Sequence, residues 1–224
     1  MRISILMPCL NEAETIEECI RKAQTYLAAN NIDGEIVIAD NGSIDNSVYL
    51  AERLNARVVR CEKKGYGAAL KYGISQCKGE YVIFADCDCS YDFSMLDGFI
   101  EAFETGYEYV NGNRFEGDLL KGAMPFSHKI GVRVLSYIAA KKYKTPVLDY
   151  HCGLRGFKQS CINIDELKSD GFEFATELIA YAYKKRLKAC EVPVCLYPDK
   201  RSRKPHLRTI SDGIRHLQLI LKGK

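Results

Sequence analysis

Long apolar runs and a strong charge of one sign are both missing from this 224-residue sequence. No stretch approaches the ~18–20 consecutive apolar residues of a membrane-spanning helix. The apolar run before Pro8 is too short for a signal peptide. The 32 basic and 29 acidic residues leave a net charge of only +3, which gives no indication of nucleic-acid binding. We therefore expect a cytoplasmic, enzyme-sized domain.

Paired cysteines and two familiar nucleotide-binding loops are missing as well. The ten cysteines include no C-x-x-C pair and lie within strand-like or helix-like patterns, so we expect reduced thiols and no zinc site. No G-x-x-x-x-G-K-[ST] loop is present, which argues against a kinase or ATPase of that class. The pair Gly65 and Gly67 lacks the third glycine of G-x-G-x-x-G and follows the third expected strand, so nicotinamide-dinucleotide binding is not expected.

Short apolar runs alternate with helical patterns in the first half of the chain. Hydrophobic residues make up 47% of the sequence, enough for a sizeable core. The runs predict strands at 3–8, 35–39, 57–61 and 81–85, with helices at 12–29, 45–54 and 67–77. Repeated strand–helix units predict an α/β fold, with a mostly parallel central sheet and helices on both faces.

The pattern changes after residue 92. We expect helices at 93–105, 125–144, 172–185 and 209–221, and strands at 107–113, 154–158 and 189–196. From residue 200 onward, eight Lys or Arg residues stand against a single acid. The last helix is basic and amphipathic, so it can lie on an anionic membrane surface or pack on the domain, and both readings stay open. No linker or repeat divides the chain, which predicts one domain over residues 1–224.

Three acidic loops follow strands of the predicted parallel sheet. Residues 11–12 follow the first strand, residues 40–43 the second, and the D-x-D motif of Asp86 and Asp88 the fourth. Ligands bind beyond the carboxyl ends of strands in such sheets. Two carboxylates one residue apart can reach a single Mg²⁺ or Mn²⁺, which would hold the phosphates of a substrate. The alternative is that these carboxylates only cap a helix or a turn.

Four segments of the first half resemble glycosyltransferase family 2. They are I-L-M-P-C-L-N-E at 5–12, E-I-V-I-A-D-N-G-S-I-D at 35–45, G-Y-G-A-A-L with a further glycine at 65–73, and the D-x-D motif. Segments of the second half resemble the polyprenyl-phosphate and dolichyl-phosphate mannosyl- or glucosyltransferases of this family: G-N-R at 112–114, D-Y-H-C-G-L-R-G-F at 149–157, G-F-E-F-A-T-E-L at 171–178 and E-V-P-V at 191–194.

The resemblance implies a GT-A fold, which is Rossmann-like, and an inverting hexosyltransferase that uses a nucleotide-diphosphate sugar (UDP- or GDP-hexose) with Mg²⁺ or Mn²⁺. Residues 1–113 would be the half that binds the nucleotide sugar, and residues 114–224 the half that binds the acceptor. The donor would be bound by residues of the first half: Pro8, Asn11, Glu12, Asp40 (against the base), Gly67 and Asp86. Asp86 and Asp88 would hold the metal. Two departures stand out, because Asn41 replaces an aspartate and Cys152 a small polar residue.

The acceptor decides which residues are catalytic. Polyprenyl phosphate is the favoured acceptor, and Arg114 would then position its phosphate, since arginine matches phosphate oxygens. Arg133, Arg201 and Arg203 are further candidates for phosphate binding, and His151 and His206 are weaker ones. A saccharide or small-molecule hydroxyl would need a base instead, for which Asp149 is the best candidate unless it merely caps a turn. A hypothesis from a different functional class is that the protein is a non-catalytic module that binds nucleotide sugars. We expect a cytoplasmic protein, in peripheral contact with the inner face of the membrane if the acceptor is a lipid.

Overall fold

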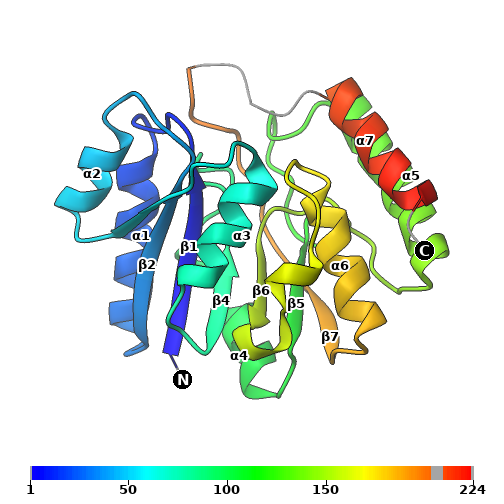
Figure 1. Ribbon diagram of the computed structural model, residues 1–224, viewed down its shortest axis with the longest axis horizontal. Helices are drawn as coiled ribbons and strands as arrows, with labels where there is room; N and C mark the ends of the chain where they lie inside the picture. Colours follow the sequence, from blue (N-terminus) through cyan, green and yellow to red (C-terminus); the bar gives the residue numbers. More distant parts are fainter. Residues whose placement is uncertain (1, 203–208, 223–224) are drawn as a thin grey trace.

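A seven-stranded sheet runs through the centre of the molecule (Figure 1). The computed structural model describes residues 2–202 and 209–222, without the side chains of 209–212 and 222. The strands are β1 (Arg2–Cys9), β2 (Asp33–Asp40), β3 (Arg57–Arg60), β4 (Tyr81–Phe84), β5 (Tyr109–Asn113), β6 (Arg155–Lys158) and β7 (Ala189–Pro193). Their order is β3-β2-β1-β4-β6-β5-β7, and only the pairings of β6 are antiparallel. The predicted α/β fold with a mostly parallel sheet is confirmed.

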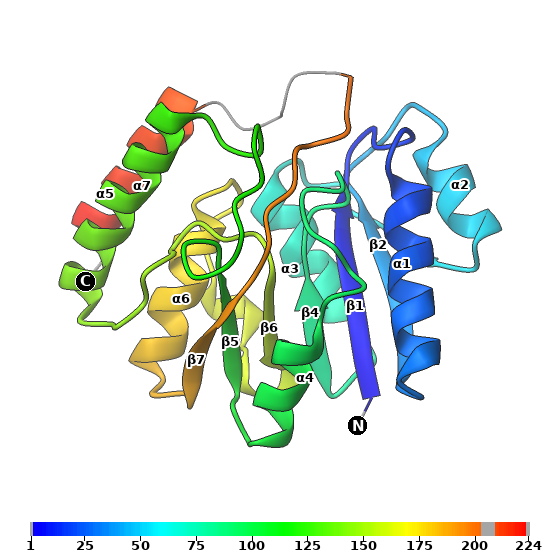
Figure 2. The ribbon, with the colours of Figure 1, turned by 180° about the vertical axis from the view of Figure 1, so that it is seen from behind.

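Helices cover both faces of this sheet. They are α1 (Ile16–Ala29), α2 (Ser47–Arg53), α3 (Tyr66–Gln76), α4 (Asp97–Glu104), α5 (Phe126–Tyr143), α6 (Phe174–Lys184) and α7 (Thr209–Lys222). In Figure 1, α3 and α6 lie in front of the sheet, whereas α1 and α4 cover the face seen in Figure 2. The pair α5 and α7 pack on each other and on α6. All these elements lie close to their predicted ranges.

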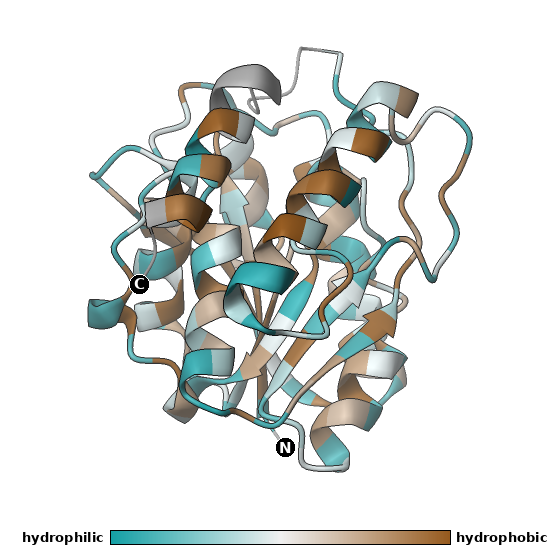
Figure 3. Ribbon diagram, turned by 90° about the vertical axis from the view of Figure 1, so that its right-hand side faces the viewer, coloured by the Kyte–Doolittle hydropathy of each residue, from teal (hydrophilic) through white to brown (hydrophobic). Residues whose placement is uncertain are grey.

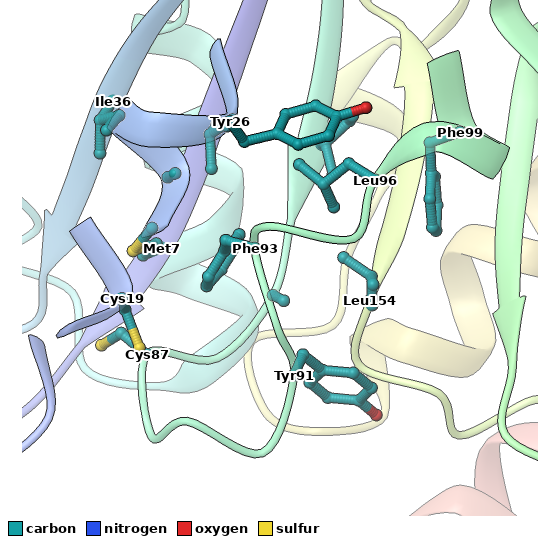
Figure 4. Close-up of a cluster of buried hydrophobic side chains, with 14 of the residues drawn as sticks. Met7, Cys19, Tyr26, Ile36, Cys87, Tyr91, Phe93, Leu96, Phe99 and Leu154 are labelled. Atoms are coloured by element: carbon teal, nitrogen blue, oxygen red, sulfur yellow. The ribbon is translucent and has the colours of Figure 1, made fainter. Parts of the chain in front are cut away.

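The side chains of β1 alternate between two cores. Ile5 and Met7 join the core shared with α1 and α4, while Leu6 joins the core beneath α3 and α6. Figure 4 shows part of the first core, where Met7 and Phe93 lie among buried side chains from α1 and the segment after β4. A strand covered on both faces is apolar throughout, which explains the continuous run in the sequence.

Two helices start later than the sequence predicts, at Ile16 rather than residue 12 and at Asp97 rather than residue 93. The Thr15 hydroxyl donates to the carbonyl of Cys87 over 2.7 Å, which holds residues 12–15 in a turn against the loop after β4. The carboxylate of Asp92 accepts hydrogen bonds from Ser94, and this turn likewise delays α4. Contacts made by polar side chains therefore set both starts.

The sequence pattern of the helix at 125–144 predicts one apolar side made by Ile130, Val134, Ile138 and Ala139. On α5 this set is divided, because Ile130 and Val134 are 50% and 52% exposed whereas Ala139 is buried. Neither α5 nor another helix within residues 2–202 and 209–222 is long and apolar enough to cross a membrane.

Candidate active site

A cavity of about 690 Å³ opens at the carboxyl ends of β1 and β4 and extends beneath α5 and α7. Seven of the predicted site residues and phosphate-binding candidates line it together: Pro8, Glu12, Asp86, Asp88, Arg114, His151 and Arg201. Pro8 lies near the end of β1, Glu12 follows this strand, the two aspartates follow β4 and Arg114 follows β5, as expected for a largely parallel sheet. The cavity has an acidic end at the D-x-D loop and a basic end around Arg114.

The D-x-D motif forms the acidic end. Asp88 accepts a hydrogen bond from the backbone N–H of Ser90 over 2.9 Å, so the loop fixes one of its oxygens. Burial and the neighbouring Asp88 raise the pKa of Asp86 to about 7, although a hydrogen bond with Tyr66 acts in the opposite direction. Without a cation, the D-x-D loop therefore disfavours a negative charge on Asp86 next to Asp88.

Arg201 places a guanidinium among these carboxylates. Its Nη2 donates to Asp88 Oδ2 over 2.8 Å and its Nη1 to Glu12 Oε1 over 3.1 Å. Asp199 accepts from its Nε over 2.8 Å. The Arg201 side chain is only 10% exposed, and the surrounding carboxylates raise its pKa even though burial opposes the charge. The predicted Arg201 thus lies in the cavity, whereas the predicted Arg203 and His206 fall outside the described residues.

The residues of the acidic end fit a divalent cation that arrives with its substrate. Within the described part of the chain, no group of three or more His, Cys, Asp or Glu side chains is arranged to hold a metal by itself. Mg²⁺ usually takes only one or two carboxylates and completes its shell with phosphate oxygens and water. Asp86 and Asp88 supply two hard ligands of this kind, and the guanidinium beside Asp88 shows that the site accommodates a cation.

Two predicted donor-binding residues lie behind the cavity wall. Both carboxylate oxygens of Asp40 accept backbone N–H groups of its own loop, from Gly42 over 3.1 Å and from Ser43 over 3.0 Å. Asn11 accepts from the backbone N–H of Ile44 over 2.8 Å, which ties the loop after β1 to the loop after β2. Neither residue lines the cavity, so in this structure they shape its walls.

Asn41, which replaces an aspartate of the family pattern, does line the cavity. Its amide donates to the carbonyls of Cys61 (3.2 Å) and Lys63 (2.8 Å), and its oxygen accepts from the backbone N–H of Gly65 (2.8 Å). A carboxylate could not make the two donations. The departure from the pattern is therefore explained by the loop at 61–65, which this amide holds in place.

The predicted Gly67 serves packing rather than the cavity, which it does not line. A methyl group there would lie 2.7 Å from Cβ of Phe174 and from the carbonyl oxygen of Ser169. The glycine lets α3 approach the start of α6. Its neighbour Tyr66 does border the cavity and stacks on Phe172 with ring centroids 4.8 Å apart. The aromatic pair forms a flat wall next to the D-x-D loop.

Arg114 and Asp149 form a buried ion pair at the basic end. Arg114 Nε donates to Asp149 Oδ2 over 2.7 Å, and its Nη2 donates to Oδ1 over 2.8 Å. The backbone N–H groups of Arg114 and His151 also donate to this carboxylate. Asp149 is completely buried and does not line the cavity, so its enclosed carboxylate is poorly placed to act as a base. It holds Arg114, which does line the cavity.

A second guanidinium, that of Arg155, supports the same end. It is fully buried and donates to the carbonyls of Tyr150 and Cys152 over 2.9 Å, and also to the carbonyl of Ala175. These bonds fix the loop that carries Asp149. Because the hydrogen-bond acceptors of Arg155 among the described residues are uncharged, this side chain adds positive charge beneath the cavity floor.

Three histidines border the basic end from three elements: His128 on α5, His151 in the loop after Asp149, and His216 on α7. The ring of His216 lies edge to face with that of His151, and its Nδ1 is 2.9 Å from the Thr176 hydroxyl. Burial lowers the pKa of both His128 and His151, and the charge of Arg114 adds to the effect. These shifts disfavour a proton on His128 and His151, whereas the guanidiniums of Arg114 and Arg155 keep their charge at neutral pH.

Sequence reasoning missed several side chains of the cavity. Tyr66, Tyr91, Asp199, His128 and His216 were not identified. The motif that contains Tyr66 was noted, but for its glycines. Asp199 lies beyond the last expected strand and binds Arg201, which in turn binds Asp88 of the D-x-D loop, 113 positions earlier in the sequence. No local pattern marks such a residue.

The sequence was also compared with known proteins. Residues 4–163 match the family model described as Glycosyl transferase family 2. The chain is 34% identical over 221 residues to the low-salt glycan biosynthesis hexosyltransferase Agl6 of Haloferax volcanii, a match that covers 98% of this chain and 53% of that protein. It is 25% identical to the dolichol-phosphate mannosyltransferase of Pyrococcus furiosus, over 99% of this chain and 64% of the relative. The chain thus spans about half the length of the first of these relatives.

Solved structures share the fold. The crystal structure of glucosyl-3-phosphoglycerate synthase from Mycobacterium tuberculosis, in complex with Mn²⁺, UDP and glucosyl-3-phosphoglycerate, matches with a TM-score of 0.76 and 22% identity. The match covers 98% of this chain and 78% of that one. The sheet and its helices are therefore those of the GT-A fold. With the family model matching most of its length, the chain belongs to glycosyltransferase family 2.

Proposed function

We propose that the protein transfers a hexose from a nucleotide-diphosphate sugar to polyprenyl phosphate, with inversion at the anomeric carbon. One observation carries the proposal: a single cavity has carboxylates at one end and a buried guanidinium at the other. The acidic end suits a metal-bound diphosphate, and the basic end suits an anionic acceptor. Two substrates that are both phosphorylated would then meet in one space.

The donor would occupy the acidic end. Asp86 and Asp88 would hold Mg²⁺ or Mn²⁺, which would neutralise the departing diphosphate when bound. The nucleoside would lie along Pro8 and Asn41, which line the cavity beside this end. The base would be uracil or guanine. Structures of glucosyl-3-phosphoglycerate synthase contain Mn²⁺ or Mg²⁺ with UDP, which supports a divalent cation and the uracil nucleotide.

The acceptor phosphate would lie against Arg114. An anionic oxygen of the acceptor phosphate forms the new bond to the anomeric carbon. The bond between this carbon and the diphosphate oxygen breaks, and its electron pair leaves with the nucleoside diphosphate. No proton has to be removed from such a nucleophile, so no base is required. This agrees with the position of Asp149, which we propose acts by orienting Arg114. A hydroxyl acceptor would need a base at the basic end, yet the lining carboxylates among the described residues gather at the acidic end: Glu12, Asp86, Asp88 and Asp199.

The lipid would reach the site beneath α5. Met124, Val132 and Leu135 give the cavity an apolar border there, next to the basic end. The outer side of α5 is apolar as well, with exposed side chains at helical spacing: Phe126, Ile130, Val134 and Tyr137. Figure 3 shows apolar residues recurring along both α5 and α7 on the side of the molecule turned to the viewer. We propose that this side rests on the inner face of the membrane as a peripheral contact. The name of the Pyrococcus relative supports a polyprenyl-phosphate acceptor.

The test is a transfer assay with three acceptors. The protein is incubated with UDP- or GDP-hexoses and Mn²⁺, and nucleotide release and product are measured with polyprenyl phosphate, polyprenol or a soluble sugar. We expect product with polyprenyl phosphate alone. The Arg114→Ala variant should lose at least ~10-fold in kcat/KM for this acceptor, because a charged hydrogen-bond partner of the phosphate is gone. Transfer to the soluble sugar without polyprenyl phosphate would contradict the proposal and favour the hydroxyl acceptor.

A further inference from the structure

Tyr91 follows the D-x-D loop and carries a hydroxyl that the mechanism above does not use. Its ring is only 4% exposed and belongs to the core shared with α1 and α4. Figure 4 shows the ring beside Leu154, with the hydroxyl turned away from the other labelled side chains. Tyr91 also borders the cavity. The side chain therefore reaches from the core to the cavity wall.

The hydroxyl oxygen accepts a strong hydrogen bond, whereas its own proton meets only a weak acceptor among the described residues. The backbone N–H of Gly153 donates to the oxygen over 2.7 Å. The Cys152 sulfur lies 3.7 Å away, and its single proton can point to this oxygen or to the Leu154 carbonyl at 3.6 Å. A phenol can donate one hydrogen bond, and a thiol sulfur is a weak acceptor that a phosphate oxygen would replace. Burial raises the pKa of Tyr91, with Cys152 and Asp149 adding to the shift, so the hydroxyl keeps its proton near neutral pH.

The space beside Gly153 is where the two ends of the cavity meet. A methyl group on Gly153 would lie 2.9 Å from Cε2 of Tyr91, 3.3 Å from its hydroxyl oxygen and 3.4 Å from Asp86 Oδ2. The glycine thus lets the chain pass directly against Tyr91, beside a carboxylate of the acidic end. Tyr91 and Arg114 line the same cavity, and each shifts the pKa of the other. The hydroxyl therefore lies close to both the proposed donor site and the proposed acceptor site.

We propose that Tyr91 is a catalytic hydrogen-bond donor to a non-bridging oxygen of the acceptor phosphate. The inference rests on the proposed function, because it requires an anionic acceptor beside Arg114. Two donors fix the orientation of a phosphate that one guanidinium would leave free to turn, and orientation lowers the barrier to attack. The phenol keeps its proton throughout, while the phosphate oxygen bonds to the anomeric carbon and the nucleoside diphosphate leaves. The hydrogen bond from the Gly153 N–H holds the oxygen in place for this task.

The first test is Tyr91→Phe, with Tyr26→Phe as the matched control. The Tyr26 hydroxyl donates to Asp97 over 2.9 Å and does not border the cavity, so its loss should leave transfer unchanged. We expect Tyr91→Phe to lower kcat/KM for a short-chain prenyl phosphate by about 10- to 100-fold, the effect of losing a hydrogen bond to a charged group. The KM for the nucleotide sugar should stay as in wild type. An unchanged kcat/KM for the prenyl phosphate would overturn the inference.

The second test separates donation from packing, because Tyr91→Phe also removes the acceptor of the Gly153 N–H. A fluorinated tyrosine at position 91 keeps that acceptor but has a more acidic phenol. Its phenolate cannot donate, so the KM for the prenyl phosphate should rise at alkaline pH in this variant and not in wild type. Identical pH profiles through the titration of the fluorinated phenol would contradict the donor role. Wild-type protein that transfers nothing to any prenyl phosphate would instead refute the proposed function.

Discussion

Folding raises the pKa of the Asp86 carboxyl, so that it binds a proton at a higher pH than a free carboxyl does. Its pKa of about 7 lies well above the ordinary value of 3.8, because the side chain is buried and Asp88 is close. A carboxyl whose pKa is raised by folding favours the folded state below pH 4, and that contribution disappears as the pH rises through 7. The site therefore costs stability at alkaline pH when no cation is bound.

Asp86→Asn removes this cost, so without metal the variant should be more stable than wild type at pH 8 and no more stable at pH 4. One pKa unit corresponds to about 1.4 kcal/mol, so the rise from 3.8 to about 7 corresponds to roughly 4 kcal/mol at most. We expect an increase in Tm of up to about 15 °C, given roughly 2–4 °C per kcal/mol for a chain of this size. The difference in Tm between the variant and wild type is measured by thermal unfolding in the presence of a chelator at both pH values. The control is Asp92→Asn. Burial opposes the charge of Asp92, but bonds to Ser94 and Lys22 outweigh it and lower the pKa, so this variant should be less stable at pH 8. Coincident curves for wild type and Asp86→Asn at pH 8 would refute the interpretation.

The sequence identified cavity residues that belong to local motifs. It did not identify residues that reach the cavity from distant parts of the chain. The D-x-D pair was predicted from its place after an apolar strand and Arg114 from the resemblance of G-N-R to a family motif, and the structure brings all three to one cavity. Asp40 and Gly67 were assigned to the donor from two further family motifs. Neither lines the cavity in this structure, and their role in donor binding stays a prediction. A motif indicates that a position needs a certain type of residue. Whether that residue contacts the ligand or stabilises its own loop depends on tertiary packing, which the sequence does not show.

At the scale of elements, the type and order of each strand and helix followed from periodicity. The starts of α1 and α4 did not, because side-chain hydrogen bonds across the fold decide them. The orientation of α5 was equally hidden. The pattern placed Ile130, Val134, Ile138 and Ala139 on one apolar side, but Ile130 and Val134 are half exposed whereas Ala139 is buried. Periodicity shows that a helix has two faces and leaves open which one meets the core.

The exposed face of α5 should bind anionic liposomes. Val134→Glu places a charge in the middle of this face, and we expect binding to weaken by about tenfold, since burial of a valine side chain contributes roughly 1.5–3 kcal/mol. The control is Tyr49→Glu on α2, because Tyr49 is 62% exposed and lies away from α5. Sedimentation with liposomes measures both variants. Binding should also fall with salt, because basic residues such as Arg133 and Lys141 border the exposed face of α5. Equal binding by the two variants would exclude α5 as the membrane contact.

At the scale of the whole molecule, the segment after β7 returns to the beginning of the chain. Arg201 bonds Glu12 across 189 positions, and Lys200 pairs with Glu18 on α1 at 2.7 Å. The backbone N–H of Ser202 donates to Glu14 over 2.6 Å. The segment at 199–202 thus meets residues 12–18 at the acidic end of the cavity. The cation of Arg201 offsets the repulsion that its three carboxylate partners would otherwise exert on one another.

If Asp88 binds the proposed divalent cation, Arg201 would compete with that cation for its carboxylate. Removing one partner from a buried ionic cluster costs about 3–5 kcal/mol, so Arg201→Gln should unfold at a clearly lower temperature than wild type in the presence of a chelator. Mn²⁺ would then supply the missing charge, and it should raise the Tm of the variant more than that of wild type. Lys200→Gln is the matched control, since Lys200 pairs with Glu18 outside the cavity and its loss should leave the response to Mn²⁺ unchanged. Thermal unfolding over a series of Mn²⁺ concentrations compares the three proteins. An equal Mn²⁺ response in Arg201→Gln and wild type would show that the guanidinium and the metal do not share Asp88.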